Sequence, residues 1–317
     1  MLISYGLPAA FSSFFSRPTH VMGWKELRAL NLFAALSRLA AHSKMFRFPV
    51  RSMEREQFCS VCESKSELFG TGLVLTKYNV KFFRCLRCGF IQSETPYWLG
   101  EAYSSPIARS DIGYVSRNVR MARITRALIS LAFDRKGKFL DYGGGYGMFV
   151  RLMRDAGFDF YRDDRFCENL FAAGFDMSDA QHLLTRPRPF ELITAFEVFE
   201  HLADPIAEIT RMLQLAPAIF FSTFVVPEPA PAIGSWWYYV LEHGQHIAFY
   251  TIRSLEALAK TFGLQLYTNG ESLHLLTDSK IPGLFFRLAV TSPFPRLVNL
   301  IFRRESLLLK DAEITGL

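Results

Sequence analysis

Apolar positions in the second half of the chain alternate between two spacings. A helical spacing, with apolar residues every three or four positions, covers 117–133. Nearly continuous apolar runs follow it, and such runs are typical of strands that are buried on both faces. The predicted strands are 138–140, 158–161, 193–196, 218–226, 264–267 and 273–277, and the predicted helices among them are 149–156, one that begins at Pro205, and 254–262. Strands that alternate with helices in this way predict an α/β fold with a doubly wound sheet.

The N-terminal residues 1–57 have a different character. They mix apolar and basic residues, and 24–39 has helical spacing. Three interpretations stay open: an extension ahead of a true start at Met45 or Met53, a basic targeting peptide, or an amphipathic helix for a surface or a partner. We favour the first and expect little order before about residue 53.

The C-terminal residues 281–309 predict apolar helices that prolines interrupt. They either pack on the rest of the chain, form the face of a homodimer or touch a membrane surface, and we favour packing. No apolar run in the sequence reaches the roughly 18–20 uncharged residues of a membrane span.

Charge is concentrated near the N-terminus. Residues 1–57 hold eight Lys and Arg against three acidic residues, which is +5 of the formal +6. The remaining residues are therefore nearly neutral. A near-neutral body lacks the broad basic face of a nucleic-acid-binding protein, so we expect a small-molecule partner.

Four of the five cysteines form two CxxC pairs, Cys59/Cys62 and Cys85/Cys88. Two such pairs match a zinc ribbon, in which four thiolates surround Zn²⁺ at about 2.3 Å. Because four cysteines close the coordination shell, this metal is expected to be structural. Cysteines that bind a metal instead of forming disulfides also indicate a reducing compartment, and we expect a cytoplasmic protein.

A glycine-rich turn follows the strand at 138–140. Its pattern is D-x-G-x-G-x-G, with Asp141 followed by Gly143, Gly145 and Gly147. A dinucleotide turn would have a third glycine where this chain has Met148. Asp141 would repel a pyrophosphate but would attract the ammonium group of a methionine-type ligand.

Two further acids follow predicted strands. Asp164 lies 21 residues after Gly143, at the place where a carboxylate binds ribose hydroxyls. The segment 190–205 reads FELITAFEVFEHLADP, and Glu197 ends its strand. Glu200 and His201 could act as an acid/base pair, but we favour a role in fixing this loop and in hydrogen bonding to the edge of the cofactor. An HExxH-type metal site is excluded because no second His follows at helical spacing.

The glycine turn resembles motif I of the class I S-adenosylmethionine (SAM)-dependent methyltransferases, and 190–205 resembles their segment after the fourth strand. The resemblance implies a Rossmann-like sheet of seven strands. It also implies SAM as cofactor, held by the residues of the turn and by the two further acids. These cofactor-binding residues are Asp141, Gly143, Gly145, Gly147, Asp164 and Glu197.

From about Cys59 to Leu276 the chain is similar to sugar C-methyltransferases that carry a zinc ribbon. That similarity covers a zinc-ribbon-like module (58–95) and a methyltransferase domain (96–280), and we expect an extension (1–57) before them and a helical tail (281–317) after them. It also implies a substrate lid at the aromatic run 236–239 and a nucleotide-sugar or glycan precursor as acceptor.

The similarity places His246 at the active site, but the Glu-His pair of that family stands three positions earlier, as Glu242-His243. The general base therefore stays open among His246, His243 and Glu242, and so does the choice between C- and O-methylation. Two other functions also stay open. One is an RNA methyltransferase that grips RNA with its zinc module, and the other is a non-catalytic binding protein.

Overall fold

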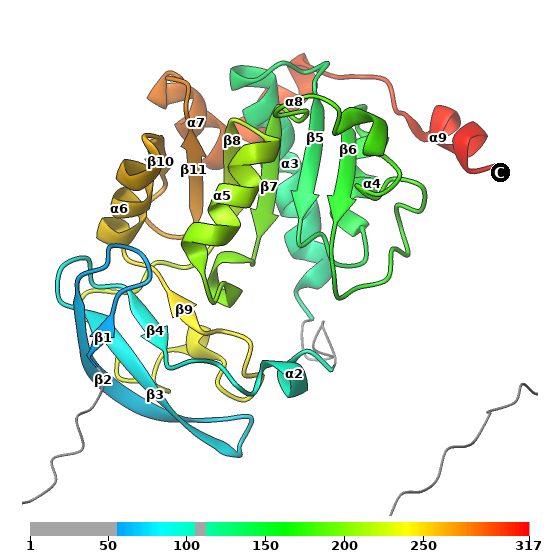
Figure 1. Cartoon of the computed structure of the whole chain (residues 1–317). Coiled ribbons are helices and arrows are strands. Elements are labelled where there is room, and N and C mark those ends of the chain that lie inside the picture. The colour runs from blue at the N-terminus through cyan, green and yellow to red at the C-terminus, as the bar shows by residue number, and fades with distance from the viewer. Residues whose placement is uncertain (1–55, 105–111, 317) are drawn as a thin grey trace, which may run out of the picture. The chain divides into compact units, whose positions relative to one another are not determined.

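A six-stranded sheet is the centre of the larger part of the chain (Figure 1). The computed structural model describes residues 56–104 and 112–316, all within one compact unit, and the predictions for the N-terminal extension lie outside these residues. Strands β5 and β6, β5 and β7, and β7 and β8 pair in parallel, and β11 is antiparallel to both β8 and β10. In sheet order the strands are β10 (Gln265–Thr268), β11 (Leu273–Thr277), β8 (Ala218–Ser222), β7 (Leu192–Phe196), β5 (Lys138–Tyr142) and β6 (Asp159–Asp163).

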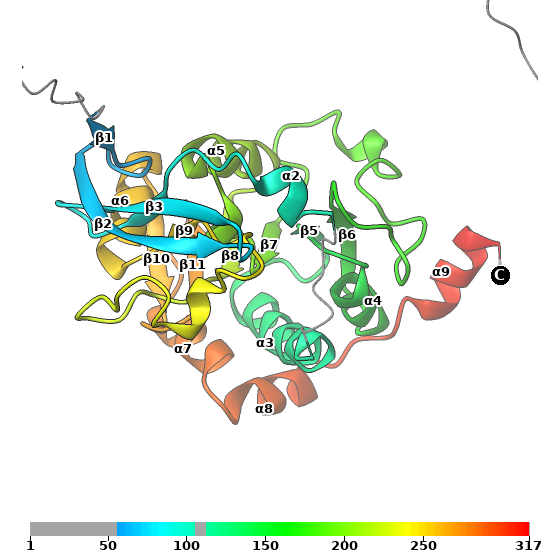
Figure 2. The same ribbon diagram turned by 90° about the horizontal axis from the view of Figure 1, so that it is seen from below.

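Helices cover both faces of this sheet, as the view from below shows (Figure 2). On one face, α3 packs against α4, α7 and α8, while α5 and α6 lie on the other. The helices are α3 (Tyr114–Ala132), α4 (Met148–Asp155), α5 (Pro205–Leu215), α6 (Ile252–Phe262), α7 (Gly283–Val290) and α8 (Phe294–Ile301). The doubly wound α/β fold is confirmed, as is the packing of the C-terminal helices on the rest of the chain. Within the described ranges, no helix has both the length and the apolar character that a membrane crossing needs.

The prediction of seven strands is wrong for the described residues. Between β6 and β7 the chain makes only an isolated parallel bridge, Arg162 to Asp176. The pairing stops there because Asp176 enters a turn, in which its N–H donates to the Asp179 carboxylate at 2.9 Å. The segment that follows holds the 3₁₀ turn η2 (Gln181–Leu183) and then Pro187 and Pro189, which lack the N–H groups of a strand.

A second, smaller sheet contains the two CxxC pairs. It is antiparallel, and its last strand, β9, comes from a distant part of the sequence and pairs with β4. In sheet order its strands are β1 (Gln57–Phe58), β2 (Lys65–Val74), β3 (Tyr78–Cys85), β4 (Ile91–Ser93) and β9 (Ala248–Phe249). Since β9 lies within the range assigned to the methyltransferase domain, the two predicted parts share a sheet.

Hydrogen bonds extend this connection on both sides of β9. The indole of Trp98, just before the short helix α2 (Leu99–Ala102), donates to the Gly244 carbonyl at 2.7 Å. The Gln245 side chain donates to the Ala102 carbonyl at 2.9 Å. At the start of α6, the Thr251 hydroxyl donates to the Cys88 carbonyl at 2.5 Å. The residues 244–251 are therefore positioned by the N-terminal sheet.

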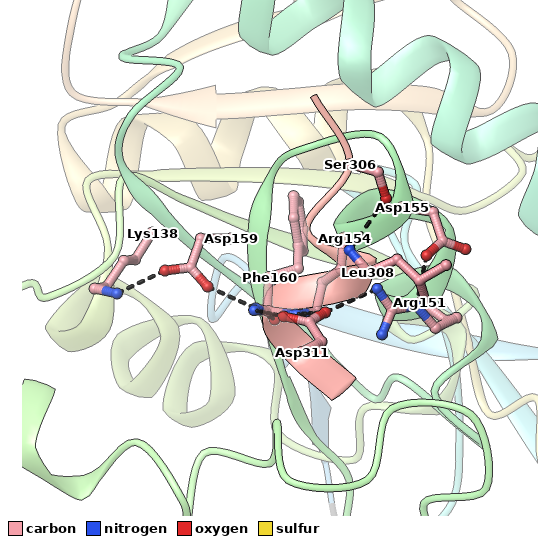
Figure 3. Close-up of polar contacts among 9 residues, drawn as sticks. All are labelled: Lys138, Arg151, Arg154, Asp155, Asp159, Phe160, Ser306, Leu308 and Asp311. Carbon is pink, nitrogen blue, oxygen red and sulfur yellow. Dashed lines mark hydrogen bonds and ion pairs between the residues drawn. The ribbon is translucent and has the colours of Figure 1, made fainter. Parts of the chain in front are cut away.

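The last helix, α9 (Leu308–Thr315), is fixed by a buried ion pair (Figure 3). Asp311 accepts two hydrogen bonds from the Arg154 guanidinium, at 2.7 and 2.8 Å, and one from Arg151 at 2.8 Å. The side chains of Arg154 and Asp311 are only 4% and 3% exposed. Arg154 also contacts Asp159 at 2.5 Å, so this network joins α4, β6 and α9.

Candidate functional site

A cavity of about 780 Å³ opens beyond the carboxyl ends of β5, β6 and β7. Ligands of doubly wound sheets bind at this edge. The acids at the carboxyl ends of the three strands, or directly after them, all line it, namely Asp141, Asp163, Asp164 and Glu197. The cavity also takes residues from α3, from the turn after β7 and from the segment before β9, including Tyr114, His201 and His246.

Asp141 lies at the base of this cavity with 3% of its surface exposed. The Thr194 hydroxyl on β7 donates to its Oδ1 at 2.6 Å. Burial raises the pKa of Asp141 to about 7, against smaller lowering effects of Thr194 and Arg162. Because neighbouring groups offset only part of the cost of burying this negative charge, a cationic group placed in the cavity would stabilise the carboxylate.

The glycine turn brings the backbone to the cavity wall at Gly143, Gly144 and Gly145. Gly143 has φ +68°, and a Cβ there would lie 2.7 Å from Val198 Cγ2, so only glycine fits. Gly147 is not among the lining residues. A Cβ on it would lie 2.6 Å from Asn169 Oδ1, so Gly147 allows close packing against the loop after β6.

Asp164 connects the glycine turn to the loop after β6. Its Oδ2 accepts from the Gly145 N–H at 2.9 Å, and its Oδ1 accepts from the N–H groups of Phe166 and Cys167, both at 2.8 Å. The ring of Phe166 in this loop stacks on Tyr103, with centroids 4.6 Å apart. The carboxylate is thus held in place at the cavity wall, with acceptor capacity left on Oδ2.

Glu197 has a left-handed backbone, with φ +54°. Its N–H donates to the Ser222 hydroxyl at 2.9 Å, and that hydroxyl donates to its Oε1 at 2.5 Å. Non-glycine residues rarely adopt this conformation, and such strain is common at functional sites. The structure therefore brings Asp141, Asp164 and Glu197 to one cavity.

Of the three candidate bases, His246 and His243 line the cavity and Glu242 does not. The Glu242 side chain is exposed, so the cavity gives it no contact with an acceptor. His246 Nδ1 lies 2.7 Å from the Tyr238 carbonyl, and burial lowers the pKa of His246 to about 4. The ring is therefore neutral at pH 7 and able to accept a proton or bind a cation.

His201 stands beside His246, whereas the sequence interpretation favoured for it a role in fixing the loop and binding the edge of the cofactor. The two imidazole rings are 4.9 Å apart and nearly perpendicular. His201 Nδ1 makes a hydrogen bond of 3.1 Å with the Tyr103 hydroxyl, and burial holds the pKa of His201 well below its usual value. The Glu200-His201 sequence could have suggested a histidine in the cavity. Its position next to His246 could not be predicted, because His246 lies far along the chain.

The four CxxC cysteines form a compact cluster, and none of them is in a disulfide. The Sγ atoms of Cys59 and Cys88 are 3.7 Å apart, and Cys62 Sγ lies 3.5 Å from those of Cys85 and Cys88. The N–H of Val61 donates to the Cys59 sulfur, and that of Cys88 donates to the Cys85 sulfur, both at 3.4 Å. Four sulfurs at this spacing with backbone donors fit a tetrahedral Zn²⁺.

Part of the chain is similar to known methyltransferases. Residues 116–269, somewhat less than half of the chain, match the sequence model of a family described as "Methyltransferase domain". No curated protein matches the chain.

Solved structures of methyltransferases are similar at low identity. Mitomycin 7-O-methyltransferase MmcR is 16% identical (TM-score 0.40) over 57% of this chain and 60% of its own length. CalO1, a methyltransferase in calicheamicin biosynthesis, is 18% identical (TM-score 0.37) over 56% of this chain and 60% of its own. Magnesium protoporphyrin IX methyltransferase from Synechocystis PCC 6803 is 13% identical (TM-score 0.31) over 57% of this chain and 90% of its own.

Proposed function

We propose that this chain is a SAM-dependent methyltransferase acting on a small molecule. The observation that carries the proposal is the buried carboxylate of Asp141, which shares one cavity with a glycine turn and with Asp164. SAM has the matching groups: an ammonium and a sulfonium of positive charge, and a ribose with two vicinal hydroxyls. The match of residues 116–269 to a methyltransferase family supports the same function.

In this proposal each acid has a separate task. Asp141 faces the positive methionyl part of SAM, because its desolvated carboxylate is stabilised by a nearby cation. Asp164 accepts a hydrogen bond from a ribose hydroxyl through the acceptor position that its backbone contacts leave on Oδ2. Glu197 borders the nucleoside at the end of β7. The backbone at Gly143 to Gly145 lets the cofactor approach closely.

Methyl transfer is a displacement at carbon. A lone pair of the acceptor forms the new bond to the methyl carbon, the bond from carbon to sulfur breaks, and the sulfonium becomes a neutral thioether. The acceptor loses one proton, which His246 Nε2 is placed to take because Nδ1 is held by the Tyr238 carbonyl. His243 lines the same cavity and is the second candidate for this proton.

We further propose that the cysteine cluster holds a structural Zn²⁺. Its four sulfurs leave no position for a substrate, so the ion serves the small sheet and not the reaction. The acceptor class that we propose, a nucleotide-linked sugar or a glycan precursor, rests on the resemblance of the sequence alone.

The experiment is a transfer assay with SAM labelled on its methyl group. The acceptor panel contains nucleotide-sugars, phenolic and aliphatic alcohols, and RNA. We expect label in a small-molecule pool, and loss of most of it in Asp141→Asn and His246→Ala. The exposed His182→Ala is the matched control and should transfer label as the wild type does. Label found only in RNA would favour the RNA methyltransferase instead.

A further inference from the structure

Three side chains with metal-ligand atoms meet at the wall of the cavity. Glu200, His201 and His246 each place one ligand atom within 4.8 Å of the other two. Both histidines line the cavity, whereas Glu200 lies behind them and is completely buried. Glu200 and His201 come from the 3₁₀ turn η3 (Phe199–His201), and His246 comes from the segment before β9.

The Glu200 carboxylate is the unusual member of this cluster. Neither of its oxygens makes a hydrogen bond of ordinary geometry among the described residues. The side chains of Tyr238 and Thr223 are close enough to favour the charged form of Glu200. Their hydroxyls also lie 3.4 Å from each other, so one of them can donate to the other instead of to the carboxylate. A buried carboxylate with no well-aligned donor is costly, and such a group in a native fold indicates a bound proton, water or ion.

The hydrogen bonds of His246 define which nitrogen is available. A carbonyl oxygen can only accept, so the 2.7 Å contact of Nδ1 with the Tyr238 carbonyl makes Nδ1 the protonated nitrogen. The neutral ring then has its lone pair on Nε2. Metal-binding histidines are commonly oriented in this way, by donating their other N–H to a backbone carbonyl.

The surrounding contacts hold the cluster in place. The N–H of Ile247 donates to the Glu200 carbonyl at 2.9 Å, which joins the two segments. The Phe199 ring stacks on Phe221 with centroids 3.8 Å apart, and the Tyr250 hydroxyl donates to the Phe199 carbonyl at 3.1 Å. Ligands fixed by packing and hydrogen bonds are arranged before an ion arrives.

We propose that Glu200, His201 and His246 bind one divalent first-row transition-metal ion. Two imidazoles and one carboxylate are a common ligand set for such ions, and they leave further coordination positions open. Those positions face the cavity, because the histidines line it and Glu200 does not. Binding at His201 replaces one of its present partners, the Tyr103 hydroxyl or the backbone of Gln245.

An ion here would specify the acceptor, a consequence that rests on the proposed methyl transfer. An oxygen of the acceptor would complete the coordination and be held beside the methyl group. His246 would then act on the acceptor through the ion and not by taking its proton, since both need Nε2. Acceptors with a hydroxyl or carbonyl oxygen are favoured over purely carbon or nitrogen acceptors.

The test is a titration of the full chain, with zinc bound to the cysteine cluster, by Co²⁺ in the absence of SAM. We expect one further Co²⁺ per chain, with visible absorption bands of nitrogen and oxygen ligands and no thiolate-to-metal band. Glu200→Gln and His246→Ala should weaken this binding at least about tenfold. The neighbouring Glu242→Gln and His243→Ala are matched controls and should bind as the wild type does. Thermal unfolding confirms that each variant folds.

Three results would overturn the site: no further Co²⁺ bound, absorption from thiolate ligands alone, or equal weakening in the two control variants. Because the titration contains no SAM, its outcome is separate from that of the transfer assay. If the chain transfers methyl groups but binds no second ion, only the proposed metal site is disproved. A chain that binds the ion but transfers nothing disproves the proposed function alone.

Discussion

At the scale of single residues, the acids of the cavity could be predicted from the sequence, whereas the contact between His201 and His246 could not. Asp141, Asp164 and Glu197 each follow an apolar run that predicts a strand, and parallel strands end at one edge. His201 and His246 are brought together by a turn and by a strand of two residues, neither of which has a hydrophobic periodicity. Gly147 shows the opposite error, because its place in the motif did not distinguish loop packing from cavity lining.

The buried Asp141 predicts a pH dependence of stability. Burial raises its pKa from 3.8 to about 7, so the folded chain keeps this proton where the unfolded chain has lost it. The stabilising contribution of this proton is therefore complete below about pH 4 and is lost as the pH rises to about 7. We expect Asp141→Asn to gain about 2–3 kcal/mol relative to the wild type between pH 5 and pH 8. Urea unfolding without ligand measures this difference, and a difference that does not change with pH contradicts it.

Gly143 predicts a local steric effect. Gly143→Ala places a Cβ 2.7 Å from Val198 and also forces a left-handed alanine. The exposed Gly270, with φ +80° and nothing within 4 Å of its Cβ position, is the matched control for the backbone effect alone. We expect Gly270→Ala to lower the free energy of unfolding by about 1 kcal/mol and Gly143→Ala by about 1–3 kcal/mol more. Equal losses of unfolding free energy in the two variants would show that the contact with Val198 does not destabilise Gly143→Ala.

At the scale of helices and strands, the elements with long apolar runs were confirmed and the short ones were missed. The helix predicted at 117–133 is α3, and each of the six predicted strands has its counterpart in the large sheet. The seventh strand is reduced to one bridge, since turn-forming Asp176 and the two prolines end the pairing. A strand as short as β9 leaves no pattern in the sequence, so the sheet that it completes could not be foreseen.

The α9 helix depends on Asp311. Its carboxylate carries two of the hydrogen bonds of the buried Arg154, and Asp159 remains as that residue's other ionic partner. We expect Asp311→Ala to destabilise the chain by about 3 kcal/mol, because a buried cation loses half of its compensation. The exposed Glu313→Gln on the same helix is the control and should change stability by less than about 0.5 kcal/mol. A loss in Asp311→Ala no larger than in the control would mean that α9 is not held by this pair.

At the scale of the whole described unit, the cysteine cluster and the cavity are one structure rather than two domains in series. Strand β9 pairs with β4 of the small sheet and begins two residues after His246, and Thr251 donates to the carbonyl of Cys88. The sequence predicted a separate module because the cysteines are close together in the chain. The connecting hydrogen bonds join residues that are far apart in it.

This connection predicts that loss of the metal affects the cavity. We expect strong chelation, or Cys88→Ser, to lower the melting temperature of the whole unit in one transition and to weaken SAM binding. Cys167→Ser, outside the cluster, is the control for the effect of thiol loss on the melting temperature. Calorimetric scans measure the transitions. Two separate transitions, with SAM binding unchanged by chelation, would show that the two parts are independent.

The central claim is that the cavity binds SAM through a buried carboxylate, and titration calorimetry with SAM tests it most directly. We predict one SAM per wild-type chain, at least about tenfold weaker binding, or about 1.4 kcal/mol, in Asp141→Asn, and unchanged binding in Glu242→Gln. No heat of binding with the wild type, or equal affinity in wild type and Asp141→Asn, would contradict the account.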